Sequence, residues 1–209
     1  MGRVYCPSTY CERVEGWQAP VLSGRIVRLE PLAADHLDGL WDASRDPRVW
    51  RWLPVLQPET RDQMAVWLDD ALARKEAGLD IPFATVSQAS GSVLGSTRFL
   101  ALRPEHRSVE IGWTWLSPAA WGTGANQEAK LLQLRHAFES WGCRRVELKT
   151  DELNAPARRS MEDFGAVFEG VHRKHMLVRD GVTRSSAWYS VLDDEWPAVE
   201  ARLSRSLDP

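Results

Sequence analysis

The chain has 209 residues, of which 44% are hydrophobic, and a formal charge of −3 at pH 7. This length and composition favour one globular domain with a single core over a disordered chain. Because there is no excess of Lys and Arg to neutralise phosphates, nucleic acid is not an expected partner. The sequence has no apolar run of membrane-spanning length and no apolar signal core near its start. We therefore expect a cytoplasmic protein that does not enter a membrane.

Cysteine and tryptophan usage narrows the classes further. Cys6, Cys11 and Cys143 are an odd number of thiols, and no second pair accompanies the first two to make a zinc site. We expect free thiols and no metal. The eleven tryptophans are unusually many. Most should fill the core, and some could line a pocket or an oligomer interface, which leaves a homodimer open.

Hydrophobic periodicity and turn residues divide the chain into elements. In chain order these are an N-terminal arm at 1–24, a strand at 25–30, helices at 35–45 and 60–78, strands at 83–87, 93–100 and 108–116, a helix at 124–141, a strand at 144–150, a helix at 154–164, strands at 167–178 and 184–192, and a C-terminal helix. The order predicts an α/β (α+β) domain over 25–197, with helices on both faces of a mixed sheet, followed by a C-terminal helix and tail at 198–209.

Three helix starts carry capping signals. Asp35 can cap the first helix, and Thr60 with Gln63 forms a capping-box pattern at the second. Asn154 can cap the helix at 154–164, where Pro156 is tolerated in the first turn. These side chains predict where the helices begin.

The strand at 108–116 has the clearest alternation. Successive side chains of a strand point to opposite faces, so one face should carry Val109, Ile111, Trp113 and Trp115. The other face should carry Glu110, Gly112 and Thr114.

A glycine-rich loop, Trp121-Gly-Thr-Gly-Ala-Asn126, joins this strand to the next helix. The first N–H groups of a helix have no partner within it, and the helix dipole makes that end positive. Gly122 and Gly124 remove the Cβ atoms that would hold an anion away, so the loop suits a phosphate or pyrophosphate. Gln127 stands where a dinucleotide fingerprint needs a third glycine. The two glycines could also do no more than form a tight turn.

The order of elements around this loop resembles the GNAT superfamily of N-acetyltransferases, and within it the Rim-type ribosomal-protein N-terminal acetyltransferases. The similarity covers residues 25–197. It rests on the Gly-x-Gly loop and on four further segments: Val109-Glu-Ile-Gly-Trp113, Leu134-Arg-His-Ala-Phe-Glu139, the Asn154 to Gly165 spacing, and Tyr189-Ser-Val-Leu with Glu195-Trp-Pro197. The resemblance implies a single GNAT-like domain with a mostly antiparallel sheet, and acetyl-CoA as co-substrate.

Carried over to this chain, the resemblance implies a set of residues around acetyl-CoA. Its pyrophosphate would lie against Trp121, Gly122, Thr123, Gly124, Ala125 and Asn126. The backbone of Leu116 would pair with the pantetheine arm, and Asn154 would lie beside that arm or act only as a helix cap. Arg158 and Arg159 could reach the adenosine phosphate. Met161 stands where many relatives carry the tyrosine that protonates the leaving thiolate. The thiolate could therefore leave unaided, take a proton from water, or take one from Ser160 or Tyr189.

Glu110 is the candidate general base. It resembles the glutamate that many relatives use through a water molecule to deprotonate the amine. Its structural alternative is an ion pair with Arg98 or Arg103 on a neighbouring strand.

The acceptor side is predicted at Val49-Trp-Arg-Trp-Leu53, between the first two helices. In similar proteins this region walls the acceptor groove, so Trp50 and Trp52 are candidate substrate-binding residues, and Arg51 could meet a carboxylate. Both indoles could instead fill the core. The predicted function is transfer of an acetyl group to a protein N-terminal α-amine or a small-molecule amine. The alternatives are a non-catalytic acyl-CoA-binding sensor module and a plain phosphate-binding domain.

Overall fold

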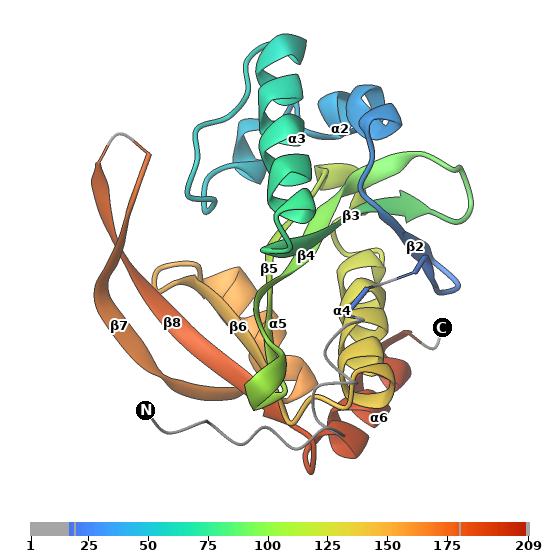
Figure 1. Ribbon diagram of the computed structural model, residues 1–209, viewed down its shortest axis with the longest axis vertical. Coiled ribbons are helices and arrows are strands. Elements are labelled where there is room, and N and C mark those ends of the chain that lie inside the picture. Colours follow the sequence, from blue (N-terminus) through green and yellow to red (C-terminus); the bar gives the residue numbers. More distant parts are fainter. Residues whose placement is uncertain (1–16, 19, 180, 208–209) are drawn as a thin grey trace, which may run out of the picture.

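An eight-stranded sheet, in the order β1-β2-β3-β4-β5-β6-β8-β7, runs through the molecule (Figure 1). The computed structural model describes residues 17–18, 20–179 and 181–207. The strands are β1 (Leu22–Ser23), β2 (Val27–Pro31), β3 (Asp80–Ser87), β4 (Val93–Arg103), β5 (Ser108–Leu116), β6 (Arg145–Asp151), β7 (Val167–Val178) and β8 (Val182–Leu192). Neighbouring strands are antiparallel except for β5 and β6, which are parallel. The predicted mixed, mostly antiparallel sheet is confirmed.

Helices cover both faces of the sheet. They are α2 (Leu37–Ala43), α3 (Arg61–Glu76), α4 (Ala125–Arg135), α5 (Ala155–Phe164) and α6 (Trp196–Leu207), with short turns η1 (Ala34–His36), η2 (Pro47–Val49), η3 (Pro104–His106), η4 (Pro118–Ala120) and η5 (His136–Ser140). One apolar core lies between the sheet and α4, α5 and α6, and the other lies under α2 and α3. None of the helices in the described ranges is long and apolar enough to cross a bilayer.

Two of the three predicted caps form as expected. The Thr60 hydroxyl accepts the Gln63 N–H at 3.2 Å, and the Asn154 side chain accepts the Ala157 N–H at 3.3 Å. Asp35 does not cap a helix, because it lies inside the η1 turn that precedes α2. Most of the predicted arm, together with Cys6, Cys11 and Asp180, lies outside the described residues.

The helix predicted at 124–141 is interrupted near its end. α4 stops at Arg135, and η5 continues it as a turn of π-helix. There the Trp141 N–H donates to the carbonyl of His136, five residues earlier, at 3.1 Å. The wider turn places the Trp141 indole against Phe99, with ring centroids 4.6 Å apart. Contact with β4 therefore decides how this helix ends.

The alternation predicted along β5 holds only up to Gly112. Trp113 has a positive φ of 51°, and the partners Ser96–Trp115 and Arg98–Gly112 leave one more residue on β5 than on β4. This is a β-bulge, which shifts the later side chains to the other face. Val109 and Ile111 face the core of α4, whereas Trp113 and Trp115 pack in the core of α2 and α3. The prediction that these four residues share one face is wrong.

Candidate active site

β5 and β6 separate partway along their length. They pair from Ser108 with Arg145 to Ile111 with Leu148, and beyond this point the described parts of the two strands are not paired with each other. β5 continues to Leu116 past its bulge, so its edge there has no neighbouring strand in the described part of the chain. Unpaired backbone groups at a sheet edge can bind an extended ligand as an added strand.

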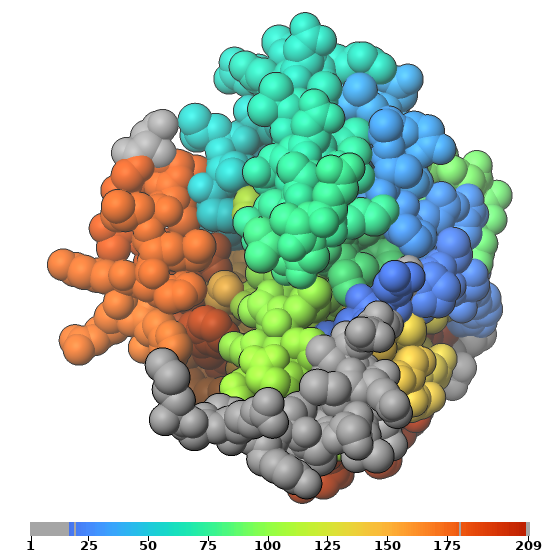
Figure 2. All heavy atoms as spheres, viewed as in Figure 1, coloured from blue at the N-terminus to red at the C-terminus, as the bar shows by residue number. Residues whose placement is uncertain are grey.

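A cleft of about 730 Å³ opens where the strands separate. Its walls come from β5, β6, the first turns of α4 and α5, the link after η2, and the β7–β8 hairpin. In Figure 2 the surface is hollowed between the orange hairpin and the green strands, below the cyan link. The volume is in the range of sites that bind small molecules and cofactors.

The glycine loop contributes Trp121, Gly122 and Asn126 to the lining of the cleft. A Cβ added at Gly122 would meet no atom within 4 Å, so the space beside this residue is open. The N–H groups of Asn126 and Gln127, in the first turn of α4, have no acceptor among the residues that the structure describes. These donors and the dipole of α4 together form a site that suits an anion.

Thr123, Gly124 and Ala125 do not line this cleft. A Cβ at Gly124 would lie 2.9 Å from Ile26 Cδ1 and 3.3 Å from Leu207 Cδ2, so the glycine makes room for packing and not for an anion. Ala125 is fully buried in the core, and the Thr123 hydroxyl donates to the Ala120 carbonyl at 2.8 Å. The structure therefore gives these three residues of the predicted loop a structural role.

Leu116 and Asn154 both lie in the cleft wall. The Leu116 carbonyl already accepts the indole N–H of Trp121 at 2.9 Å. The Asn154 amide is held at both ends, since it donates to the Thr150 hydroxyl at 2.9 Å and caps α5. Asn154 therefore shapes the wall as a cap, whatever else it contacts.

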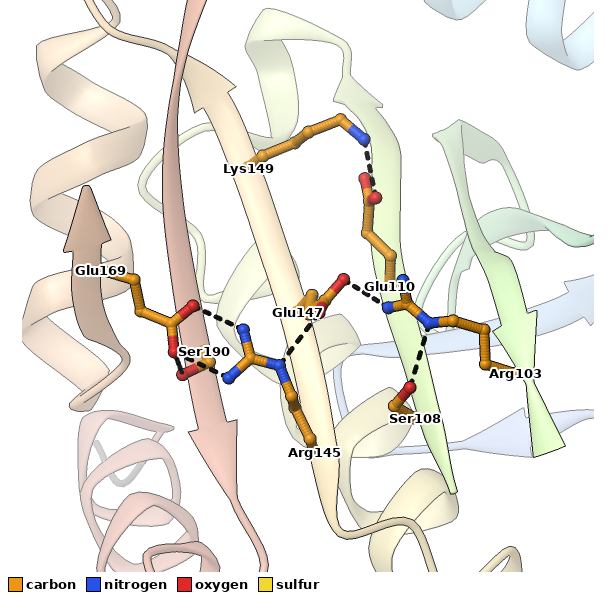
Figure 3. A network of polar contacts seen from close by, with 8 residues as sticks. All are labelled: Arg103, Ser108, Glu110, Arg145, Glu147, Lys149, Glu169 and Ser190. Atoms are coloured by element: carbon orange, nitrogen blue, oxygen red, sulfur yellow. Dashed lines mark hydrogen bonds and ion pairs between the residues drawn. The ribbon is translucent and has the colours of Figure 1, made fainter. Parts of the chain in front are cut away.

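Glu110 lies in the cleft wall and is almost completely buried. The ammonium of Lys149 donates to its carboxylate at 2.6 Å (Figure 3). Burial raises the pKa of Glu110 above the ordinary value of 4.5, while the charge and hydrogen bond of Lys149 act in the opposite direction. A carboxylate with a raised pKa in a cleft is a candidate general base.

The ion pairs considered for Glu110 from the sequence are not formed. Arg98 pairs with Asp80 at 2.9 Å, and Arg103 pairs with Glu147 in the network drawn in Figure 3. Lys149 is the partner of Glu110 because β6 runs parallel to β5, with Glu110 opposite Glu147 and Lys149 two residues further along β6. The partner depends on a parallel pairing between strands that are far apart in the sequence.

The two candidate acceptor-binding tryptophans lie in different places, one in the core and one in the cleft wall. Trp50 is only 3% exposed, donates its indole N–H to the Ser44 carbonyl at 2.8 Å, and packs 5.4 Å from the Trp115 ring. It belongs to the core of α2 and α3 and does not line the cleft. Trp52 does line the cleft, with the Arg51 guanidinium 4.8 Å from its ring.

The two arginines of α5 that were predicted to contact the adenosine phosphate also lie in different surroundings. Arg158 donates to the Tyr189 hydroxyl at 3.0 Å, and Tyr189 donates to Glu162 at 2.7 Å. Tyr189 is buried and outside the cleft, so it is not placed to donate a proton there. Ser160 does line the cleft. Arg159 lines a second hollow, of about 530 Å³ beside α4, α5 and α6, together with Arg202.

Sequence reasoning missed two buried cations in the cleft wall. Lys130 is 6% exposed and donates to the Thr114 hydroxyl at 2.7 Å, and burial lowers its pKa to about 7. Its signal in the sequence is a lysine four residues before Leu134, on the apolar stripe of the helix. Arg184 is also buried and donates to the carbonyl of Trp52 at 3.2 Å. Nothing in the local pattern of β8 distinguishes it.

The remaining cysteine and the acidic side chains do not point to other chemistry. Cys143 is buried and has no disulfide partner in the described ranges, and burial raises its pKa to about 12. In the same ranges, no group of three or more His, Cys, Asp or Glu residues is arranged to hold a metal ion.

Residues 27–167 match a family model described as an acetyltransferase (GNAT) domain. A GCN5-related N-acetyltransferase from Brucella melitensis is 35% identical, with 94% of this chain and 91% of that one covered and a TM-score of 0.85. A protein from T. thermophilus that is assigned to the acetyltransferases is 39% identical, with coverage of 92% and 100% and a TM-score of 0.84. No curated protein sequence matches significantly.

A more distant structure, Mycobacterium smegmatis RimJ in complex with CoA-disulfide, is 20% identical over 89% of this chain and 91% of that chain, with a TM-score of 0.74. At this identity the likeness shows the fold alone.

Proposed function

The chain belongs to the GNAT family of acetyltransferases, and we propose that it transfers the acetyl group of acetyl-CoA directly to an amine, with Glu110 as the general base. The observation that carries this proposal is the open edge of β5 beyond Ile111, because it lies in the same cleft as the buried carboxylate of Glu110. An extended donor at that edge would bring its reactive end close to a base.

The features that suit acetyl-CoA are distributed along the cleft. The pantetheine arm would lie along the edge of β5 near Leu116, and the diphosphate would lie against Gly122 and the free N–H groups of α4. The second hollow, with Arg159 and Arg202, would hold the adenosine phosphate. Two Arg side chains there supply the cations that a phosphate attracts. Bound acetyl-CoA supplies a thioester for the reaction.

Glu110 would remove the proton that the amine must lose. An α-amino group has a pKa near ~8 and a lysine near ~10.4, so a base helps either acceptor at neutral pH. Such a base commonly contributes on the order of 10²- to 10⁴-fold in rate. Lys149 holds the carboxylate in place, and backbone N–H groups at the edge of β5 would stabilise the oxyanion.

The acceptor is proposed to enter beside Trp52 and the β7–β8 hairpin, and to be a peptide N-terminus or a small amine. Its wall carries Arg51, Trp52, Met176 and Arg184. A sensor without activity would have no use for a buried carboxylate with a raised pKa beside the open strand edge. Glu110 therefore favours the enzyme over the acyl-CoA-binding sensor module.

Thiol release from acetyl-CoA, measured against a panel of peptides and small primary amines, tests the proposal. The expected result is amine-dependent release of CoA together with an acetylated acceptor in the mass spectrum. Binding of acetyl-CoA without turnover on any amine would instead support the sensor. No binding at all would overturn both assignments.

A further inference from the structure

Transfer from a thioester creates a need that the base does not meet. When the C–S bond breaks, sulfur leaves as a thiolate, and a proton donor assists that step. The titratable residues among the described lining of the cleft are Arg48, Arg51, Glu110, Lys130, Lys149 and Arg184. Arginine does not release its proton at neutral pH. Glu110 is assigned as the base, and Lys149 is hydrogen-bonded to it. The hydroxyl of Ser160, which also lines the cleft, is too weak an acid to serve at neutral pH, so Lys130 is the donor that remains.

Lys130 is placed on the side of the sheet opposite to Glu110. Glu110 alternates with Val109 and Ile111, which face the core of α4, and so it points to the other face. Lys130 belongs to α4 and reaches β5 at Thr114, beyond the point where β5 stops pairing with β6. The two groups therefore flank the separation of β5 and β6 from opposite faces.

No carboxylate among the described residues forms an ion pair with the Lys130 ammonium. Its neighbours on the packed elements are the hydroxyl of Thr114 on β5 and, through that hydroxyl, Thr97 on β4 and Gln133 on α4. None of these groups is charged. An ammonium that is 6% exposed, lacks a carboxylate among the described residues and lines a cleft is costly to keep charged. Such a group readily gives its proton to an anion formed beside it.

We propose that Lys130 is the general acid that protonates the departing thiolate, an assignment that rests on the proposed acetyl transfer. As the tetrahedral intermediate collapses, the C–S bond breaks and sulfur keeps the electron pair. One Nζ–H proton passes to sulfur, which gives the free thiol of CoA and a neutral amine on Lys130. The amide product keeps the acetyl carbon, Glu110 releases to water the proton taken from the acceptor, and Lys130 recovers a proton from water.

The direction of the pKa of Lys130 agrees with this role. Burial lowers the pKa of Lys130 to about 7, so the pKa of the donor would be close to a neutral working pH, where general acids are most effective. Because the protonated form is the active one, kcat should fall as the pH rises above about 7. Burial is the sole cause of this shift, and the other charged groups of the cleft, among them Glu110, Lys149 and Arg184, do not contribute to it.

The test compares Lys130→Arg and Lys130→Met with the wild-type chain, using acetyl-CoA and the best acceptor from the amine panel at saturation. Arginine retains the charge and a donor for Thr114 but cannot release a proton at neutral pH. We expect kcat to fall by about 10²-fold or more in both variants. The fall near pH 7 should disappear, while CoA affinity by calorimetry stays within about threefold. Lys75→Met, on α3, is the matched control and should retain wild-type kcat.

The outcomes separate the two assignments. If Lys130→Arg restores kcat to within about threefold of wild type, Lys130 serves only as a charge or a packing group, and the inference is overturned. Loss of kcat with the fall near pH 7 unchanged would also overturn it. Circular dichroism melting shows whether each variant folds. If Lys130→Met does not fold, the kcat and pH profile of Lys130→Arg decide the outcome. A wild-type chain inactive toward every amine would overturn the proposed function itself.

Discussion

Gly122 and Gly124 form a matched pair with which to test the anion site. Both have left-handed backbones, with φ values of 75° and 85°. Replacing either by Ala should cost about 1–2 kcal/mol, because a Cβ disfavours this conformation. At Gly124 the new methyl would also press against Ile26 Cδ1, at 2.9 Å, and this overpacking adds about 1–3 kcal/mol. Gly124→Ala should therefore destabilise by about 2–5 kcal/mol in total.

Gly124→Ala should lose more stability than Gly122→Ala, whereas Gly122→Ala should lose more affinity for CoA. At roughly 2–4 °C per kcal/mol, Gly122→Ala should lower Tm by about 2–8 °C and Gly124→Ala by about 4–20 °C. The methyl at Gly122 projects into the open cleft, where the diphosphate of CoA is proposed to lie. We expect Gly122→Ala to weaken CoA binding by at least about tenfold, which is about 1.4 kcal/mol. Gly124→Ala should leave affinity within about threefold.

Thermal melts and isothermal calorimetry with CoA measure both quantities on the same preparations, below the Tm of each variant. The reasoning would be refuted if Gly122→Ala bound CoA as tightly as wild type. It would also fail if Gly124→Ala lost more affinity than Gly122→Ala while it remained folded, because the anion would then lie on the side of Gly124.

Three further predictions concern buried charged groups and a thiol. Glu110→Gln should lower kcat by about 10²-fold or more with acetyl-CoA affinity unchanged. In the wild-type chain, kcat should fall on the acid side at a pH above 4.5, because burial raises the pKa of the base that must be deprotonated. Lys149→Met should move this acid limb to still higher pH, and an unmoved limb would show that Glu110 is not its source. Asp80→Asn leaves the buried Arg98 without its partner and should cost about 3–5 kcal/mol in urea unfolding, so a loss below about 1 kcal/mol would contradict the pairing. Cys143 should react with iodoacetamide at pH 8 at least about 10²-fold more slowly in the native chain than in guanidinium, because burial raises its pKa to about 12 and shields the thiol. Peptide masses measure the two rates, and equal rates would show that the site opens.

Local signals were sufficient for most of the fold. The Thr60 and Asn154 caps, the alternation before Gly112 and the glycine loop each depend on residues a few positions apart, and the structure confirms the elements that they predict. The order of these elements also led to the correct family and the mixed sheet. Physically, propensity, capping and periodicity act over one or two turns or along one strand, so the sequence displays them directly.

Contacts between distant segments decided the site. Gly122 and Gly124 look equivalent in the sequence, and only the packing of Ile26 and Leu207 shows which one faces the open cleft. The bulge at Trp113 arises from the register with β4, and it moves two tryptophans to the face opposite to that predicted.

The elements, their order and the residue types available for acetyl transfer can all be inferred from the order of amino acids. Which side chains come into contact depends on how the elements pack. Glu110 contacts Lys149, 39 residues later in the chain, because β5 and β6 pair in parallel. Lys130 reaches the cleft because α4 lies beside the unpaired edge of β5. Burial, charge pairing and pKa depend on atoms that folding brings together, and no short stretch of sequence contains them.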